Sequence, residues 1–254
     1  RETIIFEMQR RYAVMRRSIQ QGINKPIHTL SGMTKGNAFR FNQWRNEHLR
    51  ESICGDLLSR AVARALAVGE VNASMGCIVA TPTAGSAGIL PAVMTTLQDA
   101  RHFSDDQMIS ALLTVSGVGI VIMNRAHVSG AAGGCQAETG SAAAMTAAGV
   151  VELLGGSPHQ AVNAVAIALT NMLGLVCDPI AGLVEVPCIK RNAAAVGQAF
   201  IASELALAGI ESVIPADEVI DAMEHIGARM DERLRETAQG GLAATPTGKK
   251  LAAS

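Results

Sequence analysis

Apolar side chains recur at helical spacing along most of the chain, and this period limits the possible folds more than any other feature. In residues 2–21 they fall on nearly every turn, as Ile4, Ile5, Met8, Tyr12, Met15 and Ile19. Few segments show the period of two that marks a half-buried strand. The sequence therefore predicts an all-α fold, a single compact multi-helix domain over residues 1–254. Because the chain opens on Arg1 rather than Met, we expect a short N-terminal piece to be missing.

Helix boundaries follow from the same spacing and from start and stop residues. We expect helices over 2–21, 41–68, 105–122, 137–154, 158–173, 190–208 and 216–235, and the start of another at 85–90. Ser104, Ser157 and Pro215 are suitable helix starts. Glycine and proline break the remaining segments into loops at 23–39, 75–94, 129–135 and 177–188, and we expect the tail 240–254 to be extended.

Composition and charge exclude several classes of protein. Apolar residues make up 49% of the chain but aromatics only 3%, so small side chains must fill the core at close approach. A net charge of −1 provides no field to attract nucleic acid or an anionic membrane. Of the two most apolar stretches, 109–123 is too short to span a bilayer and 161–177 carries polar residues, so both are expected to be core helices. Residues 1–19 lack the charge-free apolar core of a secretory signal, and we expect a cytoplasmic protein.

The five cysteines fall into two groups. Cys135, Cys177 and Cys188 each lie in a loop broken by glycine or proline, where free backbone N–H groups can stabilise the thiolates that bind a metal or an iron–sulfur cluster. Their spacing matches no common zinc pattern, so the residues alone leave a metal site and inert thiols equally open. Cys54 and Cys77 lie on a helical face and beside an apolar run, and we expect both to be structural.

Several segments resemble the alpha chain of the iron–sulfur-dependent L-serine dehydratases. They are IVATPTAGSAGILPAV, GGCQAETGSAAAM, GLVCDPIAGLVEVPCIKRNAA, LSGMTKGNA and the tail GGLAATPTGKKL, which together cover essentially the whole chain. The resemblance implies a [4Fe–4S] cluster held by Cys135, Cys177 and Cys188. It also implies conversion of L-serine to pyruvate and ammonia without pyridoxal phosphate, and a separate beta chain that completes a hetero-oligomer.

Three thiolates for four irons would leave one iron open to act as a Lewis acid on the departing hydroxide of serine. A protein base must then remove the α-proton. The candidates for this catalytic work are His127, Glu138 and Lys190. The alternatives are a surface or satisfied core histidine for His127, and for Glu138 a solvated helix-cap residue or a partner of Arg191.

Two loops are candidates for binding the carboxylate of the substrate. In one, Thr83, Ser86 and Gly88 precede a helix N-terminus and resemble an anion cradle, although a tight connection between packed helices would have the same composition. The other contains Ser31, Gly32 and Thr34. Lys190, Arg191 and Asn192 begin a helix directly after Cys188, and cations at that end oppose the helix dipole. We therefore expect an anion near Arg191 and Asn192, either the cluster or the substrate.

Two alternatives to the serine dehydratase hypothesis stay open. A related cluster-containing lyase would remove sulfide from L-cysteine, and relative rates with the two substrates separate these activities. A non-catalytic helical scaffold whose thiols bind zinc or no metal would be colourless after anaerobic purification.

Overall fold

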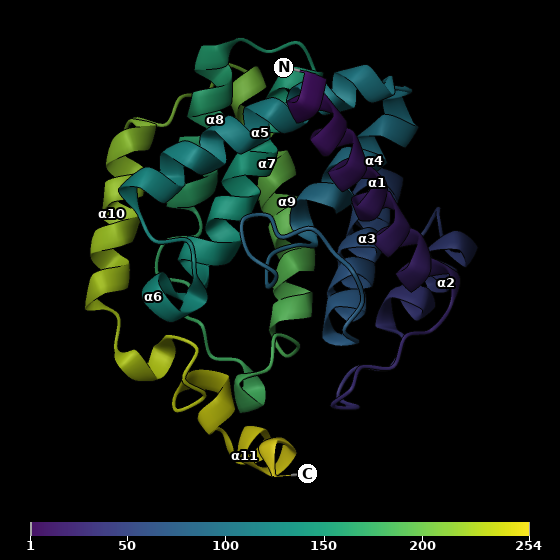
Figure 1. The fold of residues 1–254 in the computed structure, drawn as a ribbon, viewed down its shortest axis with the longest axis vertical. Helices are drawn as coiled ribbons and strands as arrows, with labels where there is room; N and C mark the ends of the chain where they lie inside the picture. The colour runs from purple at the N-terminus through teal and green to yellow at the C-terminus, as the bar shows by residue number, and fades with distance from the viewer. Residues whose placement is uncertain (1, 254) are drawn as a thin grey trace.

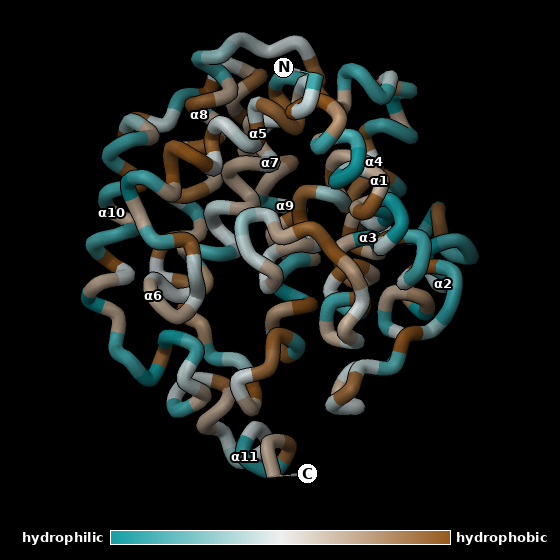
Figure 2. The backbone as a smooth tube through the Cα atoms, viewed as in Figure 1, coloured by the Kyte–Doolittle hydropathy of each residue, from teal (hydrophilic) through white to brown (hydrophobic). Residues whose placement is uncertain are grey.

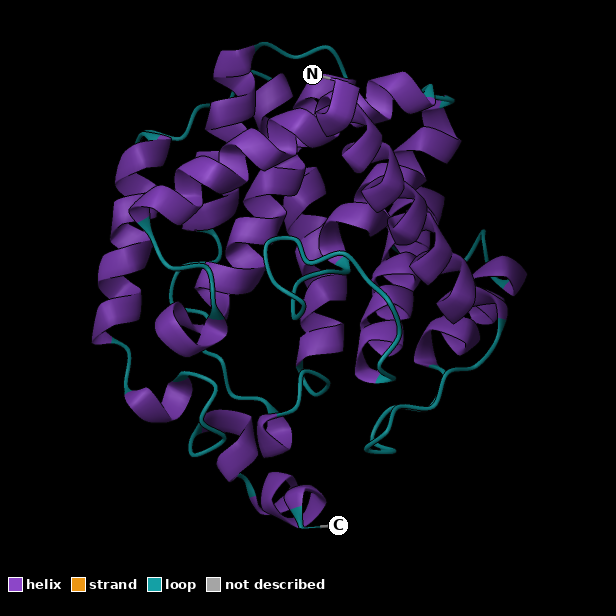
Figure 3. Cartoon of the chain, in the orientation of Figure 1, coloured by secondary structure: helices purple, strands orange, loops and turns teal. Residues whose placement is uncertain are grey.

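One almost completely buried helix, α7 (Ser141–Leu153), forms the centre of the molecule, and α8 (Pro158–Thr170) packs against it through its buried residues 164–169. Alanine and glycine dominate α7, so its neighbours approach closely: α5 (Asp105–Arg125), α8 and α9 (Cys188–Leu207) all pack against it. Figure 1 shows the computed structural model, which describes residues 2–253. Within that range Figure 3 shows helices and loops without strands, which confirms the predicted all-α fold.

The remaining helices surround this centre. They are α1 (Glu2–Asn24), α2 (Asn37–Glu47), α3 (Gly55–Ala73), α4 (Ile89–Arg101), α6 (Gly130–Cys135), α10 (Ala216–Arg229) and α11 (Pro246–Ala252). Short turns of other helix types lie at η1 (Gln136–Gly140), η2 (Ile180–Gly182), η3 (Glu232–Leu234) and η4 (Gly241–Ala244). Figure 2 shows that α2, at the edge of the molecule, is mostly hydrophilic.

The expected helix starts at Ser104 and Ser157 are confirmed. Each serine accepts a hydrogen bond from the backbone N–H three residues on, and the glutamine there, Gln107 or Gln160, binds back to the serine N–H. These capping boxes satisfy N–H groups that a helix end otherwise leaves unpaired. They fix the first turns of α5 and α8.

One expected helix, 41–68, is wrong because the chain forms two helices there. The segment 48–54 between α2 and α3 turns instead, and Gly55 at its end has a φ of +64°. Leu49 and Ile53 suggested a continuous apolar face, yet Ile53 is fully exposed. Apolar spacing persisted where the backbone did not stay helical.

The C-terminal region also differs from expectation. The predicted helix 216–235 ends at Arg229, where Met230 takes an extended conformation. The tail, expected to be extended, forms η4 and α11. Thr245 caps α11 by accepting from the Gly248 N–H, and Pro246 occupies its first turn, a common helix start.

Helix α5 is longer than the apolar stretch expected there. In the described part of the chain it is the one helix with the length and composition that would let it cross a membrane. Core helices that pack along one side satisfy the same criterion, and α5 buries Leu112, Val115 and Ile122 while packing on α7. The expectation that this stretch is too short to span a bilayer is therefore wrong. The packing of α5 on α7 still supports the expectation of a core helix.

Candidate functional site

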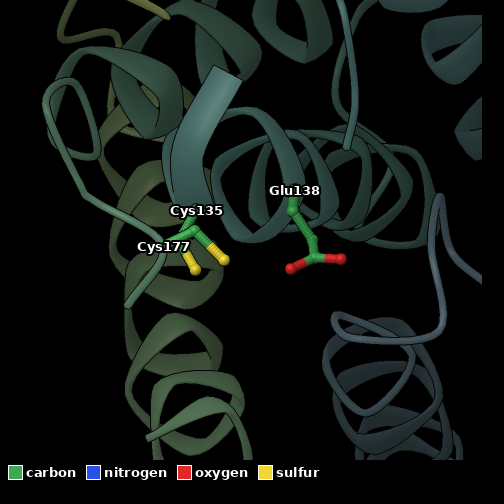
Figure 4. A group of neighbouring side chains, drawn as sticks. All are labelled: Cys135, Glu138 and Cys177. Carbon is green, nitrogen blue, oxygen red and sulfur yellow. The ribbon is translucent and has the colours of Figure 1, made fainter. Parts of the chain in front are cut away.

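Two of the predicted cysteines and Glu138 meet in one buried group. The sulfurs of Cys135 and Cys177 and a carboxylate oxygen of Glu138 all lie within 4.8 Å of one another. Figure 4 shows the two sulfurs side by side, with the Glu138 carboxylate extending beside them. Cys135 ends α6, Glu138 follows in η1, and Cys177 comes from a loop 42 positions further along the sequence. Such a group is compatible with a metal site.

The backbone around Cys135 explains how these segments meet. Residues Gln136–Gly140 form a π-helical turn, a local widening that is frequent at functional sites. The backbone N–H of Gln136 donates to Leu175 O at 2.9 Å. The side-chain oxygen of Gln136 accepts from the Gly174 N–H at 2.8 Å. Gln136 therefore fastens the loop of Cys177 to the turn that follows Cys135.

The three thiols differ in acidity. The Cys177 thiol hydrogen-bonds the Cys135 sulfur and lowers the pKa of Cys135, with a further contribution from the Arg191 charge. The same interaction and burial raise the pKa of Cys177. Burial raises the pKa of Cys188 to about 12. One thiolate is therefore favoured beside a cation, and the other two thiols need a bound metal ion to lose their protons.

Cys188 lies at the first position of α9 and is also buried. Its sulfur is outside the 4.8 Å group, but charges on Cys135 and Glu138 act on its pKa. Three free thiols are therefore buried here, and thiolate is the ligand type that soft metals prefer. Cys54 and Cys77 are exposed, so the expectation that they pack as structural core side chains is wrong.

Glu138 is buried and held by the loop at residues 83–88. The Thr83 hydroxyl donates to its carboxylate, and burial raises the pKa of Glu138. Gly85 leaves room for this carboxylate, because a Cβ there would lie 2.6 Å from Glu138 Oε1 and would displace it. Glu138 is therefore not a solvated cap residue. The pairing expected with Arg191 is replaced by an ion pair between Arg191 and Asp178, 2.8 Å apart.

Asn192 connects the same loop to α9. Its side-chain oxygen accepts from the Gly88 N–H at 2.9 Å, and its amide nitrogen donates to the carbonyls of Gly85 and Cys188. The Ser86 hydroxyl donates to the Thr81 carbonyl. Asn192 thus fixes the backbone of the loop that carries Thr83, Ser86 and Gly88.

The second predicted loop reaches a buried carboxylate that the sequence analysis did not single out. Glu185 is 3% exposed and accepts hydrogen bonds from the Thr29 and Ser31 hydroxyls, both at 2.5 Å. Ser31 and Glu185 border a cavity of about 300 Å³ together with Ala84 of the other loop. The structure therefore brings the two candidate loops to one cavity. Gly32 is exposed, and Thr34 is buried with its carbonyl bound by Thr29.

Two predicted residues lie apart from the thiols. The His127 imidazole pairs with Glu224 at 2.8 Å and is largely exposed. Lys190 is exposed on the first turn of α9. Neither is a member of the group formed by Cys135, Cys177 and Glu138.

The sequence analysis missed residues that border the site from the loops and from the C-terminal region. Asp178 binds Arg191, and the negative charge of Glu236 raises the pKa of both Cys177 and Glu138. The sequence predicts residues 230–235 as the end of a helix, whereas in the structure Leu234 and Glu236 pair with the backbone of Cys177. Asp178 directly follows the predicted ligand Cys177, and this position was the one feature of the sequence that could have indicated its place in the site.

Comparisons with known proteins identify the family of this chain. The family model described as serine dehydratase alpha chain matches residues 1–243. A protein of Bacillus subtilis named "Probable L-serine dehydratase, alpha chain" is 51% identical over 251 residues, covering 99% of this chain and 83% of that protein. The L-serine dehydratase alpha chain of Peptoniphilus asaccharolyticus is 49% identical over 238 residues, 94% of this chain and 81% of the relative. An L-serine dehydratase of Mycobacterium bovis is 50% identical over 188 residues, 70% of this chain and 40% of that protein. This chain belongs to the serine dehydratase alpha chain family.

Proposed function

We propose that this chain is the catalytic subunit of an L-serine dehydratase that forms pyruvate and ammonia with a [4Fe–4S] cluster held by Cys135, Cys177 and Cys188. The observation that carries the proposal is the buried group of Cys135, Cys177 and Glu138 in a member of this family. Relatives named as alpha chains of L-serine dehydratase support L-serine as substrate and a separate beta chain in a hetero-oligomer. The free thiols suit a reducing compartment such as the cytoplasm.

The cluster would supply one function that the side chains lack. When bound by these residues, the cluster would provide Lewis acidity that stabilises the departing β-hydroxide of serine. The protein contributes the charge balance: Arg191 lies 3.5 Å from the Cys135 sulfur and offsets the negative charge of the thiolates.

Glu138 is the proton acceptor that the geometry supports best. It lies beside the thiols, and burial raises its pKa above that of a free carboxylate, which makes it a stronger proton acceptor. Removal of the α-proton and loss of hydroxide leave aminoacrylate, which tautomerises and is hydrolysed to pyruvate and ammonia. His127 and Lys190 lie outside this group.

The cavity between the two candidate loops is the place we assign to the substrate carboxylate. The Ser31 and Thr83 hydroxyls already donate to Glu185 and Glu138, so they orient these acids. Backbone N–H groups of residues 83–86 would then be the donors for the substrate carboxylate, in the manner of an anion cradle. The other predicted residues of the two loops would contribute to carboxylate binding through the shape of the backbone; they are Gly32, Thr34, Ser86 and Gly88.

The decisive experiment is anaerobic reconstitution of the full chain with iron, sulfide and a separately purified beta chain, followed by an assay for pyruvate. We expect brown protein with absorbance near about 400 nm that bleaches in air, and pyruvate formed from L-serine. Faster turnover of L-cysteine with release of sulfide would identify the cysteine-specific alternative. A colourless protein with bound zinc and no turnover of either substrate would support the alternative of a non-catalytic helical scaffold.

A further inference from the structure

The C-terminal segment 234–242, which we call the strap, lies along the loop that carries Cys177. The Cys177 N–H donates to Leu234 O at 2.8 Å, and the Glu236 N–H donates to Cys177 O at 2.7 Å. Arg235 reaches the Ala132 carbonyl at 3.4 Å, in the short helix that ends with Cys135. The strap therefore contacts both segments that supply the paired sulfurs.

The far end of the strap fixes Asp178. The Leu242 N–H donates to Asp178 Oδ2 at 2.7 Å, and Asp178 is only 3% exposed. The preceding residue, Gly241, has a φ of +56°, and a Cβ on it would overlap the Asp178 carboxylate. Glycine is thus needed at this position for the strap to reach the acid.

Asp178 in turn orients Arg191. Its other oxygen lies 2.8 Å from Arg191 Nη2, while Arg191 Nη1 donates to Val176 O at 2.9 Å and lies 3.5 Å from the Cys135 sulfur. The guanidinium of Arg191 thus lies between the Asp178 carboxylate, the Val176 carbonyl and the Cys135 sulfur. A continuous path of contacts therefore leads from the strap to a predicted ligand sulfur.

We propose that Asp178 is a positioning residue that, held by the strap, keeps Arg191 against the Cys135 sulfur and so strengthens binding of the iron centre. An N–H donor and a positive charge beside a thiolate offset its negative charge and raise the reduction potential. Loss of such supporting partners typically weakens metal binding about 10- to 100-fold. The inference rests on the proposed function for a thiolate-held iron centre, but it requires no turnover.

The first test compares Asp178→Asn with wild-type full chain, both loaded anaerobically with iron and sulfide. Asparagine keeps the shape and can still accept from Leu242, but it has no charge to hold Arg191. We expect a chelator to remove iron about 10-fold faster or more. The matched control is Asp99→Asn, which removes an ion pair with Arg64 elsewhere in the molecule. Equal rates of iron loss from the Asp178→Asn and Asp99→Asn proteins would overturn the proposal.

The second test addresses the strap and uses alanine at two left-handed glycines. Gly241→Ala would displace Asp178, whereas Gly209→Ala has the same kind of backbone strain, at a φ of +80°, but an open space around its Cβ. We expect faster iron loss only from the Gly241→Ala protein. Equal rates of iron loss from the Gly241→Ala and Gly209→Ala proteins would show that the strap does not support the iron centre. A wild-type chain that takes up no iron contradicts the proposed function, whereas a loaded wild type with unaffected variants contradicts this inference alone.

Discussion

At the scale of single residues, the surroundings of Glu138 distinguish it from the other candidate bases. Glu138 is buried beside two thiols, whereas His127 is exposed and paired with Glu224. We predict that Glu138→Gln lowers kcat about 100-fold or more, because general base catalysis contributes at least that much. The absorbance of the cluster should stay unchanged, since glutamine preserves the hydrogen bond from Thr83. Steady-state kinetics with the iron content measured on the same sample checks this.

The control for Glu138 is Glu224→Gln, which removes the charged partner of His127. We expect its kcat to stay close to the wild-type value. If Glu224→Gln lowered kcat more than Glu138→Gln did, the general base would lie near His127 rather than at Glu138.

The cysteines give a second prediction at this scale. Alanine at Cys135, Cys177 or Cys188 should abolish both activity and bound iron, because each removes one of three buried thiols. Cys54→Ala and Cys77→Ala should keep both, since these thiols are exposed. Iron analysis of the five anaerobically loaded proteins checks the assignment. Loss of iron from the Cys77→Ala protein would mean that the ligand set is wrong.

At the scale of elements, the loop at residues 83–88 controls the position of Glu138. Gly85→Ala would place a methyl group against the carboxylate, since the nearest oxygen is 2.6 Å from that Cβ. We predict a loss of kcat of about 10-fold or more, because small displacements of catalytic groups are costly. The control is Gly117→Ala on α5, where the Cβ meets nothing within 4 Å and alanine favours the helix. A Gly85→Ala enzyme with unchanged kcat would show that the loop does not set the acid's position.

The helix boundaries show what apolar spacing can predict. The starts of α5 and α8 followed from capping serines, because a cap is a local interaction between residues three apart. The break between α2 and α3 was missed because Leu49 and Ile53 continue the apolar spacing on the surface. Spacing reports which side of a helix is apolar and does not report whether the backbone hydrogen bonds continue.

The site was predictable where its residues carry a local signal. Glycine and proline predicted loops around Cys135 and Cys177, and the structure places both sulfurs in one group. The predicted loop 129–135 is wrong, because Ser129 caps the short helix α6 that ends with Cys135, and Cys188 likewise begins α9 rather than lying in a loop. The contacts of Asp178 with Leu242, and of Glu185 with Ser31, join residues 64 and 154 positions apart. No local pattern specifies such pairs, because they depend on how the helices pack.

At the scale of the whole molecule, alkaline stability depends on the one tyrosine of the chain. Tyr12 on α1 is buried and donates to Gln98 of α4 at 2.6 Å, and burial raises its pKa. The unfolded chain ionises its tyrosine near pH 10, before the folded one does, so stability should fall as the pH rises above about 10. Tyr12→Phe should lose less stability over that interval, although it starts about 1 kcal/mol lower without the hydrogen bond. Urea unfolding of both proteins at pH 8 and pH 11 measures their free energies of unfolding. Equal pH dependence of wild type and Tyr12→Phe would show that Tyr12 does not cause the loss of stability.

The iron centre should also stabilise the fold as a whole. Its ligands and their supports come from segments 130–138, 177–191 and 234–242, which only the folded chain brings together. A ligand that binds the folded state alone contributes about 4 kcal/mol at a concentration 1,000 times its Kd, and a chain of this size gains roughly 2–4 °C in Tm for each kcal/mol. We therefore predict that chelation of iron lowers the Tm by about 8–16 °C in anaerobic calorimetry, whereas Cys177→Ala has the same Tm with and without iron. A wild-type Tm that does not change on chelation would mean that these segments do not share one iron centre.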